Sequence, residues 1–472
     1  MSRQGRMIKT TIIYFIGNFA SKLLSFFLLP LYTAYLTVED FGQADLFMST
    51  LPLIAPIFTM QVTESVFRFL CTNKEEEERK KTITNSLIIF LTGTLIFVIL
   101  YVPFAMKFKL EYALLFFLYF LITYIGIFFQ QVLRGLQRNL EYAINGIIIT
   151  VVQATLNIVL ITRFGMGGES LLIAATSASL IIAIIVALRI KIWTLISFKM
   201  ISKEEIRKQL VYGLPLIPNQ ICWWVIGLLG KYILLYYSGS GDNGILAVAS
   251  KFPALLTTIN SIFFLAWTEN IIKEFDAEDR DEYFSKSFVN FFIFSISAAA
   301  CLLPVIRVYN AMTISGEFIE AWRYVPILYL GAVFNGFSSF LGTAYTASMQ
   351  TKAAFTTTIV SAISNLIISL ILIPFFSIWG VVFANMISFM VLFGVRIKSI
   401  RKIVGIQFNI LKLLPSTILI FMAILIYYTG NLFGQTIFLI TSAIISLWLN
   451  KDVLVGILAI KKNKDVKRTV EN

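Results

Sequence analysis

Three lysines, Lys22, Lys231 and Lys251, interrupt long apolar runs of the sequence. A charged side chain near the centre of a bilayer costs about 2.5–3.5 kcal/mol on insertion scales, so it usually faces a helix bundle or a wet cavity. Lys22 shares one predicted helical face with Asn18, which supports an inward orientation. Ammonium groups in such places suit an anionic ligand such as a phosphate. The alternative is that the lysines extend along their helices toward the headgroups.

A polar and aromatic stripe leads along the predicted helix 214–237 to Lys231. Asn219, Trp223 and Gly227 precede it at intervals of four residues, which places all of them on one helical face. The indole of Trp223 could stack on a sugar ring, or it could anchor the helix at the membrane interface. The sequence leaves both roles open.

Acidic residues follow a different pattern from the lysines. No Asp or Glu lies deep in a predicted span, and Asp45 lies near the outer end of one. We therefore expect membrane cations without matching anions, which favours an anionic substrate over a cationic drug. Glu64 and Arg68, four residues apart, predict an ion pair at a cytoplasmic helix end. Arg134, at the cytoplasmic mouth, could attract a diphosphate, although the excess of basic residues in cytoplasmic loops explains it alone and is the favoured interpretation.

Prolines mark two predicted spans as places where a helix bends. Pro215 and Pro218 lie in the first turns of the run 214–237, and Pro52 and Pro56 lie in the run 41–67. Proline frees backbone groups inside a helix and permits a kink, so we predict hinges at these positions. Pro215 also suits an ordinary helix N-terminus.

These residues must be positioned by a membrane bundle. The chain of 472 residues is 58% hydrophobic and only 14% charged, whereas soluble domains are about 45–50% apolar and about 25% charged. The sequence contains no histidine, which excludes histidine-based catalysis and metal binding. The three cysteines are far apart and predict neither a disulfide framework nor a metal site. We expect no enzyme, no catalytic residue and no bound metal.

The apolar runs predict an all-α polytopic membrane protein with about 14 transmembrane helices, because a span needs about 20 apolar residues. Most of the 39 Lys and Arg residues fall in loops on one side, which places both termini in the cytoplasm. The predicted organisation has five parts: an N-terminal six-helix half (1–188), a cytoplasmic linker (189–213), a C-terminal six-helix half (214–395), two additional helices (396–449) and a basic cytoplasmic tail (450–472).

An internal repeat supports the two halves. Asp40-Phe-Gly42 opens the second span and Asp242-Asn-Gly244 opens the eighth, each followed by a proline at a similar distance. Parallel repeats of this kind are typical of transporters that move two halves around a central site.

Together these features resemble a known family. Glu39-Asp-Phe-Gly42, the pair Gln137 and Glu141-Tyr142, and the series Asn365, Ile373-Pro374 and Gly380 are similar to motifs of Wzx-type O-antigen and capsule flippases. These belong to the multidrug/oligosaccharidyl-lipid/polysaccharide (MOP) superfamily. One departure is that many relatives carry an acidic residue next to the basic one near the end of span seven, whereas here Gly230 precedes Lys231.

The resemblance implies a flippase that moves undecaprenyl-diphosphate-linked oligosaccharides across the bacterial cytoplasmic membrane by alternating access through a basic cavity. It implies no cofactor, with H⁺ or Na⁺ coupling left open, and no nucleic acid as a partner. Partners would be the lipid-linked glycan, the bilayer and, as a further expectation, the polysaccharide polymerase and chain-length machinery.

Two alternatives stay open. A cation-coupled multidrug or small-molecule exporter on the same fold would need a carboxylate deep in the membrane. A scaffold or scramblase of an envelope complex would have no gated cycle, and the parallel repeat argues against it.

Overall fold

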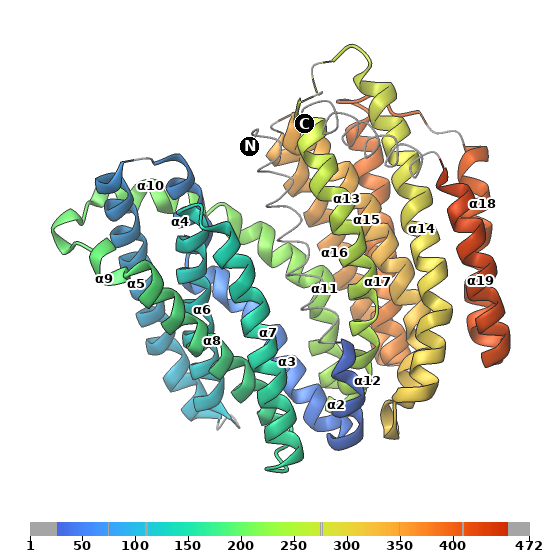
Figure 1. Cartoon of the computed structure of the whole chain (residues 1–472), viewed down its shortest axis with the longest axis horizontal. Coiled ribbons are helices and arrows are strands. Elements are labelled where there is room, and N and C mark those ends of the chain that lie inside the picture. Colours follow the sequence, from blue (N-terminus) through green and yellow to red (C-terminus); the bar gives the residue numbers. More distant parts are fainter. Residues whose placement is uncertain are drawn as a thin grey trace, which may run out of the picture. The chain divides into compact units, whose positions relative to one another are not determined.

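The computed structural model describes residues 26–73, 75–108, 112–273, 275, 277–348, 350–407 and 410–451. Within these ranges the chain is helical and contains no strand (Figure 1). Twelve of the described helices are long and apolar enough to cross a membrane. This confirms the predicted all-α polytopic class, while the full number of spans and the side of the termini stay predictions. Lys22 and Asn18 lie outside the described residues.

The helices fall into two compact units. Unit 1 comprises residues 1–247 and 316–318, and unit 2 comprises 248–315 and 319–472. The seventh predicted span packs with the N-terminal helices in unit 1, and the predicted organisation into two six-helix halves stays a prediction. The repeat itself stays a prediction.

Unit 1 is built around two apolar clusters between neighbouring helices. One lies between α4, α5, α6 and α8, and the other joins α3, α5, α6 and α8. Phe97 and Phe120 of the second cluster have ring centroids 4.1 Å apart. The elements of unit 1 are α2 (Leu29–Tyr35), α3 (Val38–Phe58), α4 (Val62–Thr72), α5 (Glu76–Phe108), α6 (Ala113–Gly135), α7 (Asn139–Thr162), α8 (Glu169–Ile190), α9 (Ile192–Leu195), η1 (Phe198–Met200), α10 (Lys203–Gly213), α11 (Leu216–Ser238) and most of α12 (Ser240–Lys251).

Unit 2 has a core rich in phenylalanine. Phe291 of α14 stacks on Phe340 of α15 with ring centroids 5.5 Å apart, and Phe292 stacks on Phe337 at 4.6 Å. Helices α18 and α19 both pack against α14, as Figure 1 shows. The elements of unit 2 are the end of α12, α13 (Pro253–Lys273), α14 (Arg280–Thr313), most of η2 (Gly316–Tyr324), α15 (Val325–Ala347), α16 (Thr351–Phe376), α17 (Ile378–Ile400), α18 (Ile410–Thr429) and α19 (Leu432–Leu449).

The second predicted span is two helices. Pro52 and Pro56 lie inside α3, but the chain breaks only after Phe58, where Met60 and Gln61 adopt positive φ angles of 51° and 54°. The hydroxyl and the backbone N–H of Thr59 both donate to the carbonyl of Ala55, at 2.7 and 2.8 Å, at the end of α3. The prolines therefore precede the break and do not mark its position.

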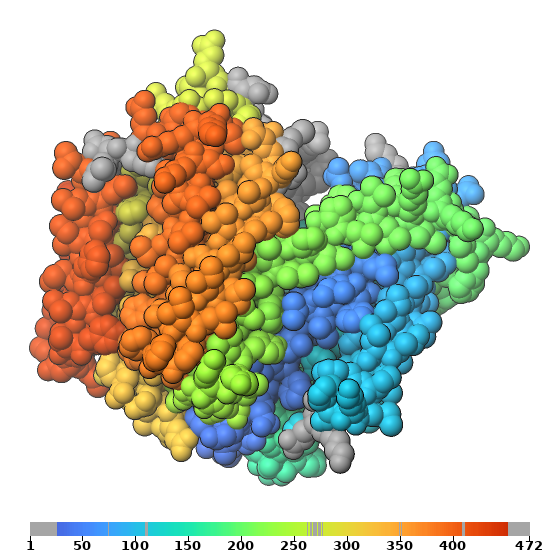
Figure 2. All heavy atoms as spheres, turned by 180° about the vertical axis from the view of Figure 1, so that it is seen from behind, coloured from blue at the N-terminus to red at the C-terminus, as the bar shows by residue number. Residues whose placement is uncertain are grey.

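The predicted linker is a folded part of unit 1. Gln209 of α10 accepts from the hydroxyl of Ser86 at 2.6 Å and donates to the carbonyl of Thr82 at 3.2 Å. Asn85 donates to the carbonyl of Met200 at 3.0 Å. These bonds, of which the two made by Gln209 are buried, fix α10 and η1 against α5. Figure 2 shows the green linker atoms along the surface of unit 1. Pro215 is the N-cap residue of α11 and Pro218 lies in its first turn.

The two Asp-x-Gly motifs of the repeat meet in unit 1. A Cβ atom added to Gly42 would lie 2.1 Å from the carbonyl oxygen of Ser240, and one added to Gly244 would lie 2.0 Å from that of Val38. Only glycine allows the start of α3 and the start of α12 to approach so closely. The repeated motifs thus define a close helix crossing.

Candidate functional site

Lys231 forms a buried ion pair between two membrane-spanning helices. Its Nζ, on α11, donates to the carboxylate of Asp45 on α3 and to the hydroxyl of Ser49 at 3.2 Å. The side chains of Lys231 and Asp45 are only 9% and 13% exposed. Asp45 lies about two turns after the start of α3 and Lys231 about two turns before the end of α11.

A set of hydrogen bonds fixes α3 and α11 around the pair. The indole of Trp224 donates to the carbonyl of Ser49 at 2.9 Å, and Asn243 of α12 donates to the carbonyl of Lys231 at 2.9 Å. The hydroxyl of Tyr232 bonds that of Thr50. These contacts hold the ammonium and the carboxylate in one geometry, which is required if a buried pair is to offset its desolvation cost.

The expectation of membrane cations without matching anions is wrong for Lys231. Its acidic partner comes from α3, 186 residues earlier, and not from the position next to it, which Gly230 occupies. Because the charges of Asp45 and Lys231 cancel, the pair is neutral as it stands. An anion could bind Lys231 only by taking the place of Asp45. The substrate-binding role of Lys231 stays a prediction.

The rest of the predicted stripe on α11 is more open than Lys231. Asn219 and Trp223 are partly exposed, and a Cβ atom added to Gly227 would meet nothing within 4 Å. Trp224, which faces α3, is the buried tryptophan of the pair. The stripe therefore combines accessible polar and aromatic groups with a buried cation at one end.

The other predicted site residues in the described part of the chain, Lys251, Arg134, Glu64 and Arg68, lie on helices other than α3 and α11, which carry the Asp45–Lys231 pair. Lys251 is half-buried at the end of α12 and belongs to unit 2. Arg134 lies in the last turn of α6, and its Cζ atom is 4.1 Å from the centroid of the Phe67 ring. The predicted ion pair of Glu64 and Arg68 does not form in the described part of the chain, although both residues lie on α4.

Comparison with known proteins identifies the family. The model of the polysaccharide biosynthesis protein family matches residues 7–272. The chain belongs to this family. A search of the curated proteins returned no match.

Solved structures give the fold of this family member. A lipid II flippase MurJ in an inward closed conformation has a TM-score of 0.73 and 19% identity, over 95% of this chain and 100% of that chain. A multidrug resistance MATE transporter of the MOP superfamily, in an inward-facing conformation, has a TM-score of 0.60 and 15% identity, over 83% and 98%. A MOP superfamily transporter from Pyrococcus furiosus has a TM-score of 0.55 and 15% identity, over 84% and 96%. The family member is thus a multi-pass membrane protein with the MOP fold.

A second buried cation of this family member was not among the predicted site residues. Arg396 of α17 is 5% exposed and donates to the carbonyl of Ser338 and to the hydroxyls of Thr357 and Thr358, both at 3.3 Å. A Cβ atom added to Gly342 would lie 2.7 Å from its Nη1. All these partners are neutral, and the tight packing indicates a structural role that joins α15, α16 and α17.

The described residues contain no cluster of His, Cys, Asp or Glu side chains that could hold a metal ion. Cys71, Cys222 and Cys301 are free thiols.

Proposed function

We propose that this chain is a flippase that moves polyprenyl-diphosphate-linked oligosaccharides across the bacterial cytoplasmic membrane by alternating access. Family membership and the MOP fold support transport without enzymatic catalysis. The observation that carries the proposal is Lys231, a buried membrane cation whose carboxylate partner belongs to a different helix.

The mechanism is an exchange of partners at Lys231. Without substrate, Asp45 neutralises the ammonium, so the empty site carries little net charge. The diphosphate brings negative charge and oxygen acceptors that can replace the carboxylate of Asp45. The bonds that join α3 to α11 through this pair then weaken, so substrate binding favours a second conformation. A ligand shifts such an equilibrium only by its different affinity for the two states.

The displaced carboxylate needs compensation, because an unpaired buried charge is costly. We propose that a coupling ion, H⁺ or Na⁺, binds Asp45 when the substrate holds Lys231. Its release would restore the Asp45–Lys231 pair and reset the cycle. The proline-containing segments around Pro52, Pro56, Pro215 and Pro218 are the proposed hinges.

Glycan contacts are assigned to the open part of the stripe. Trp223 would stack on a sugar face and Asn219 would bond hydroxyl groups, since both are partly exposed on the helix that carries Lys231. Lys22, Asn18, Lys251 and Arg134 are proposed to add basic and polar contacts. The lipid tail would stay in the bilayer, and delivery to a polysaccharide polymerase would follow on the outer side.

Proteoliposomes containing a fluorescent polyprenyl-diphosphate oligosaccharide test the proposal. Flipping is measured as the fraction of label that an external glycosidase reaches. The D45N/K231Q variant, which removes both charges together, should flip at less than a tenth of the wild-type rate while remaining folded. Lys80→Gln, which alters an exposed ion pair, should flip normally. Wild-type flipping by the double variant would overturn the exchange mechanism.

A second function is favoured by one specific observation. A cation-coupled drug exporter requires a carboxylate within the membrane, and Asp45 is such a carboxylate. If this function holds, Asp45→Asn alone should abolish resistance to cationic drugs in cells that express the protein, and lipid-linked oligosaccharides should not be moved.

A further inference from the structure

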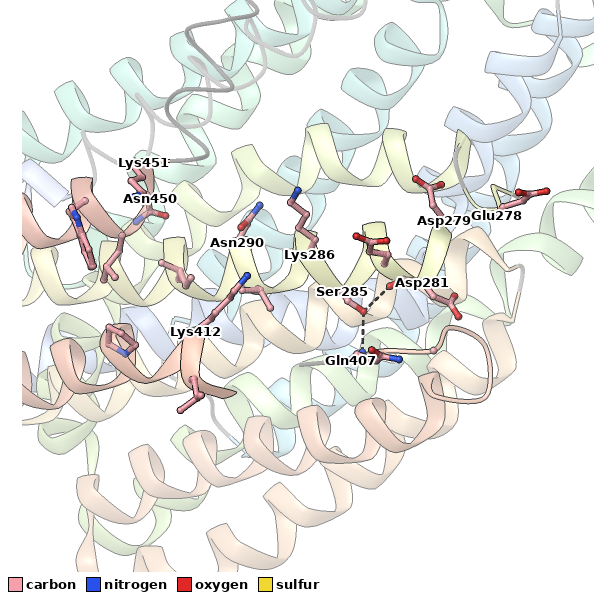
Figure 3. A pocket seen from close by; sticks show the side chains of 18 residues that line it. Glu278, Asp279, Asp281, Ser285, Lys286, Asn290, Gln407, Lys412, Asn450 and Lys451 are labelled. Carbon is pink, nitrogen blue, oxygen red and sulfur yellow. Dashed lines mark hydrogen bonds between the residues drawn. The ribbon is translucent and has the colours of Figure 1, made fainter. Parts of the chain in front are cut away.

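A large cavity opens in unit 2 where α14, α18 and α19 meet. Its volume is about 1370 Å³, above the roughly 300–1,000 Å³ of ordinary small-molecule pockets. Its lining comes from the first turns of α14, the segment before α18, the start of α18 and the end of α19 (Figure 3). The cavity shares no residue with the Asp45–Lys231 site.

Hydrogen bonds hold the walls of the cavity in place. The hydroxyl of Ser285 accepts from the backbone N–H of Gln407 at 3.1 Å and donates to the carbonyl of Asp281 at 2.7 Å. At the other end, the amide of Asn450 donates to the hydroxyl of Ser297 at 3.3 Å. The cavity is therefore preformed, and a ligand would bind without first ordering its walls.

The charges of the lining are separated along the cavity. Lys286 lies on α14, Lys412 lies on α18 and Lys451 follows the end of α19, and none of them has an ion-pair partner within the described residues. The carboxylates lie near the start of α14, where Asp281 already pairs with Arg280 at 2.9 Å. Figure 3 shows Lys286 and Asn290 on one stretch of α14 and the acidic side chains beyond it. The lysine end offers three ammonium donors, and Glu282, which also lines the cavity, lies one turn before Lys286 on α14.

Apolar surface continues from the lysine end. Val289, Ile293, Leu411, Pro415 and Leu449 line the cavity there. The neighbouring helices α18 and α19 are red in Figure 2. They carry exposed large apolar side chains that suit lipid tails: Ile418, Phe421 and Leu425 on α18, and Ile440, Ile444 and Leu447 on α19. Trp448, whose ring lies 5.8 Å from Nζ of Lys451, has the amphipathic character of side chains at a membrane interface.

We propose that this cavity binds the headgroup of an anionic phospholipid. The phosphate would lie among Lys286, Lys412 and Lys451, and the acyl chains would follow the apolar faces of α18 and α19. The positive-inside distribution of charge places these lysines at the cytoplasmic leaflet, where anionic headgroups attract basic side chains. A free phosphate would use the lysines but would leave the apolar part of the cavity unfilled, so the lipid is the occupant that matches both parts.

Native mass spectrometry of the full chain, purified in detergent with a defined lipid, tests the proposal. Wild-type protein should retain phosphatidylglycerol at least tenfold more than phosphatidylcholine. The K286Q/K412Q/K451Q variant should lose this preference, and K286R/K412R/K451R should keep it because the charges remain. The K352Q/K398Q/K402Q variant is the matched control, since it removes three exposed lysines of unit 2 that do not line the cavity.

Three results would overturn the proposal. One is equal retention of phosphatidylglycerol by the cavity variant and the matched control. Another is equal retention of the two lipids by wild-type protein. The third is displacement of phosphatidylglycerol by millimolar inorganic phosphate, which would indicate a phosphate site. Size-exclusion profiles identical to wild type verify that each variant is folded, and flipping by the cavity variant can be measured separately because the Asp45–Lys231 pair is intact.

Discussion

Removing one charge of the Asp45–Lys231 pair should destabilise the protein more than removing both. In Lys231→Gln the carboxylate of Asp45, 13% exposed, loses its ammonium partner, and in Asp45→Asn the ammonium of Lys231, 9% exposed, loses its carboxylate. Breaking a buried pair from one side typically costs about 3–5 kcal/mol, because an uncompensated charge stays in a poorly solvated place. Each 1.4 kcal/mol is about tenfold in an equilibrium constant, so the folded-to-unfolded ratio should fall by roughly two to nearly four orders of magnitude.

The D45N/K231Q variant should recover most of this loss. Two neutral amides have a much smaller desolvation cost than ions, and they can bond each other and Ser49 in place of the pair. The coupling free energy from the double-mutant cycle should therefore be about 2 kcal/mol or more, at the upper part of the range for contacting residues.

These differences in stability are measured by thermal unfolding in detergent. Unfolding is monitored through the labelling of Cys222, a half-buried thiol on α11. Lys80→Gln is the control, because the Glu76–Lys80 pair spans 2.8 Å but its glutamate is 78% exposed. Such surface pairs contribute about 0–1 kcal/mol. The reasoning is refuted if either single variant is as stable as the control, or if the double variant is no more stable than the single ones.

Three further predictions concern the packing of unit 1. Gly244→Ala should lower the free energy of unfolding by about 1–3 kcal/mol or more, since its Cβ would lie 2.0 Å from the carbonyl oxygen of Val38. Gly146→Ala, which has open space around its Cβ, should be neutral or stabilising, and the unfolding midpoints of the two variants test this difference. Trp224→Phe should cost about 1 kcal/mol through the lost 2.9 Å hydrogen bond to Ser49, and an unchanged midpoint would contradict that bond. Gln209→Ala should release α10 and speed tryptic cleavage of the 189–213 linker, while cleavage at the wild-type rate would mean that other contacts suffice.

The membrane class and most spans could be predicted because the bilayer imposes a simple rule on the sequence. Runs of about 20 apolar residues become helices, and each described span overlaps a predicted run. The helix break at Met60 and Gln61 could not be located in this way. Neither residue is a glycine, so their positive φ angles left no compositional signal, and the nearby prolines drew attention to an earlier point.

The partner of Lys231 was missed for a different reason. The pair joins residues 186 positions apart, and only the packing of α3 against α11 creates it. A signal was available, because Asp45 and Ser49 have the four-residue spacing that identified the stripe on α11. Arg396 was overlooked because it follows an apolar run and so reads as a loop residue, whereas α17 extends past it to Ile400.

The most direct test of the central claim is made in cells that lack the gene. The lipid-linked oligosaccharide pool is radiolabelled, and the fraction that stays on the cytoplasmic leaflet is quantified in the deletion strain, after complementation, and with D45N/K231Q. The account predicts accumulation on the cytoplasmic leaflet that the intact gene reverses and the double variant does not. A pool distributed as in wild-type cells, in a strain without a second flippase, would contradict the account and favour small-molecule export.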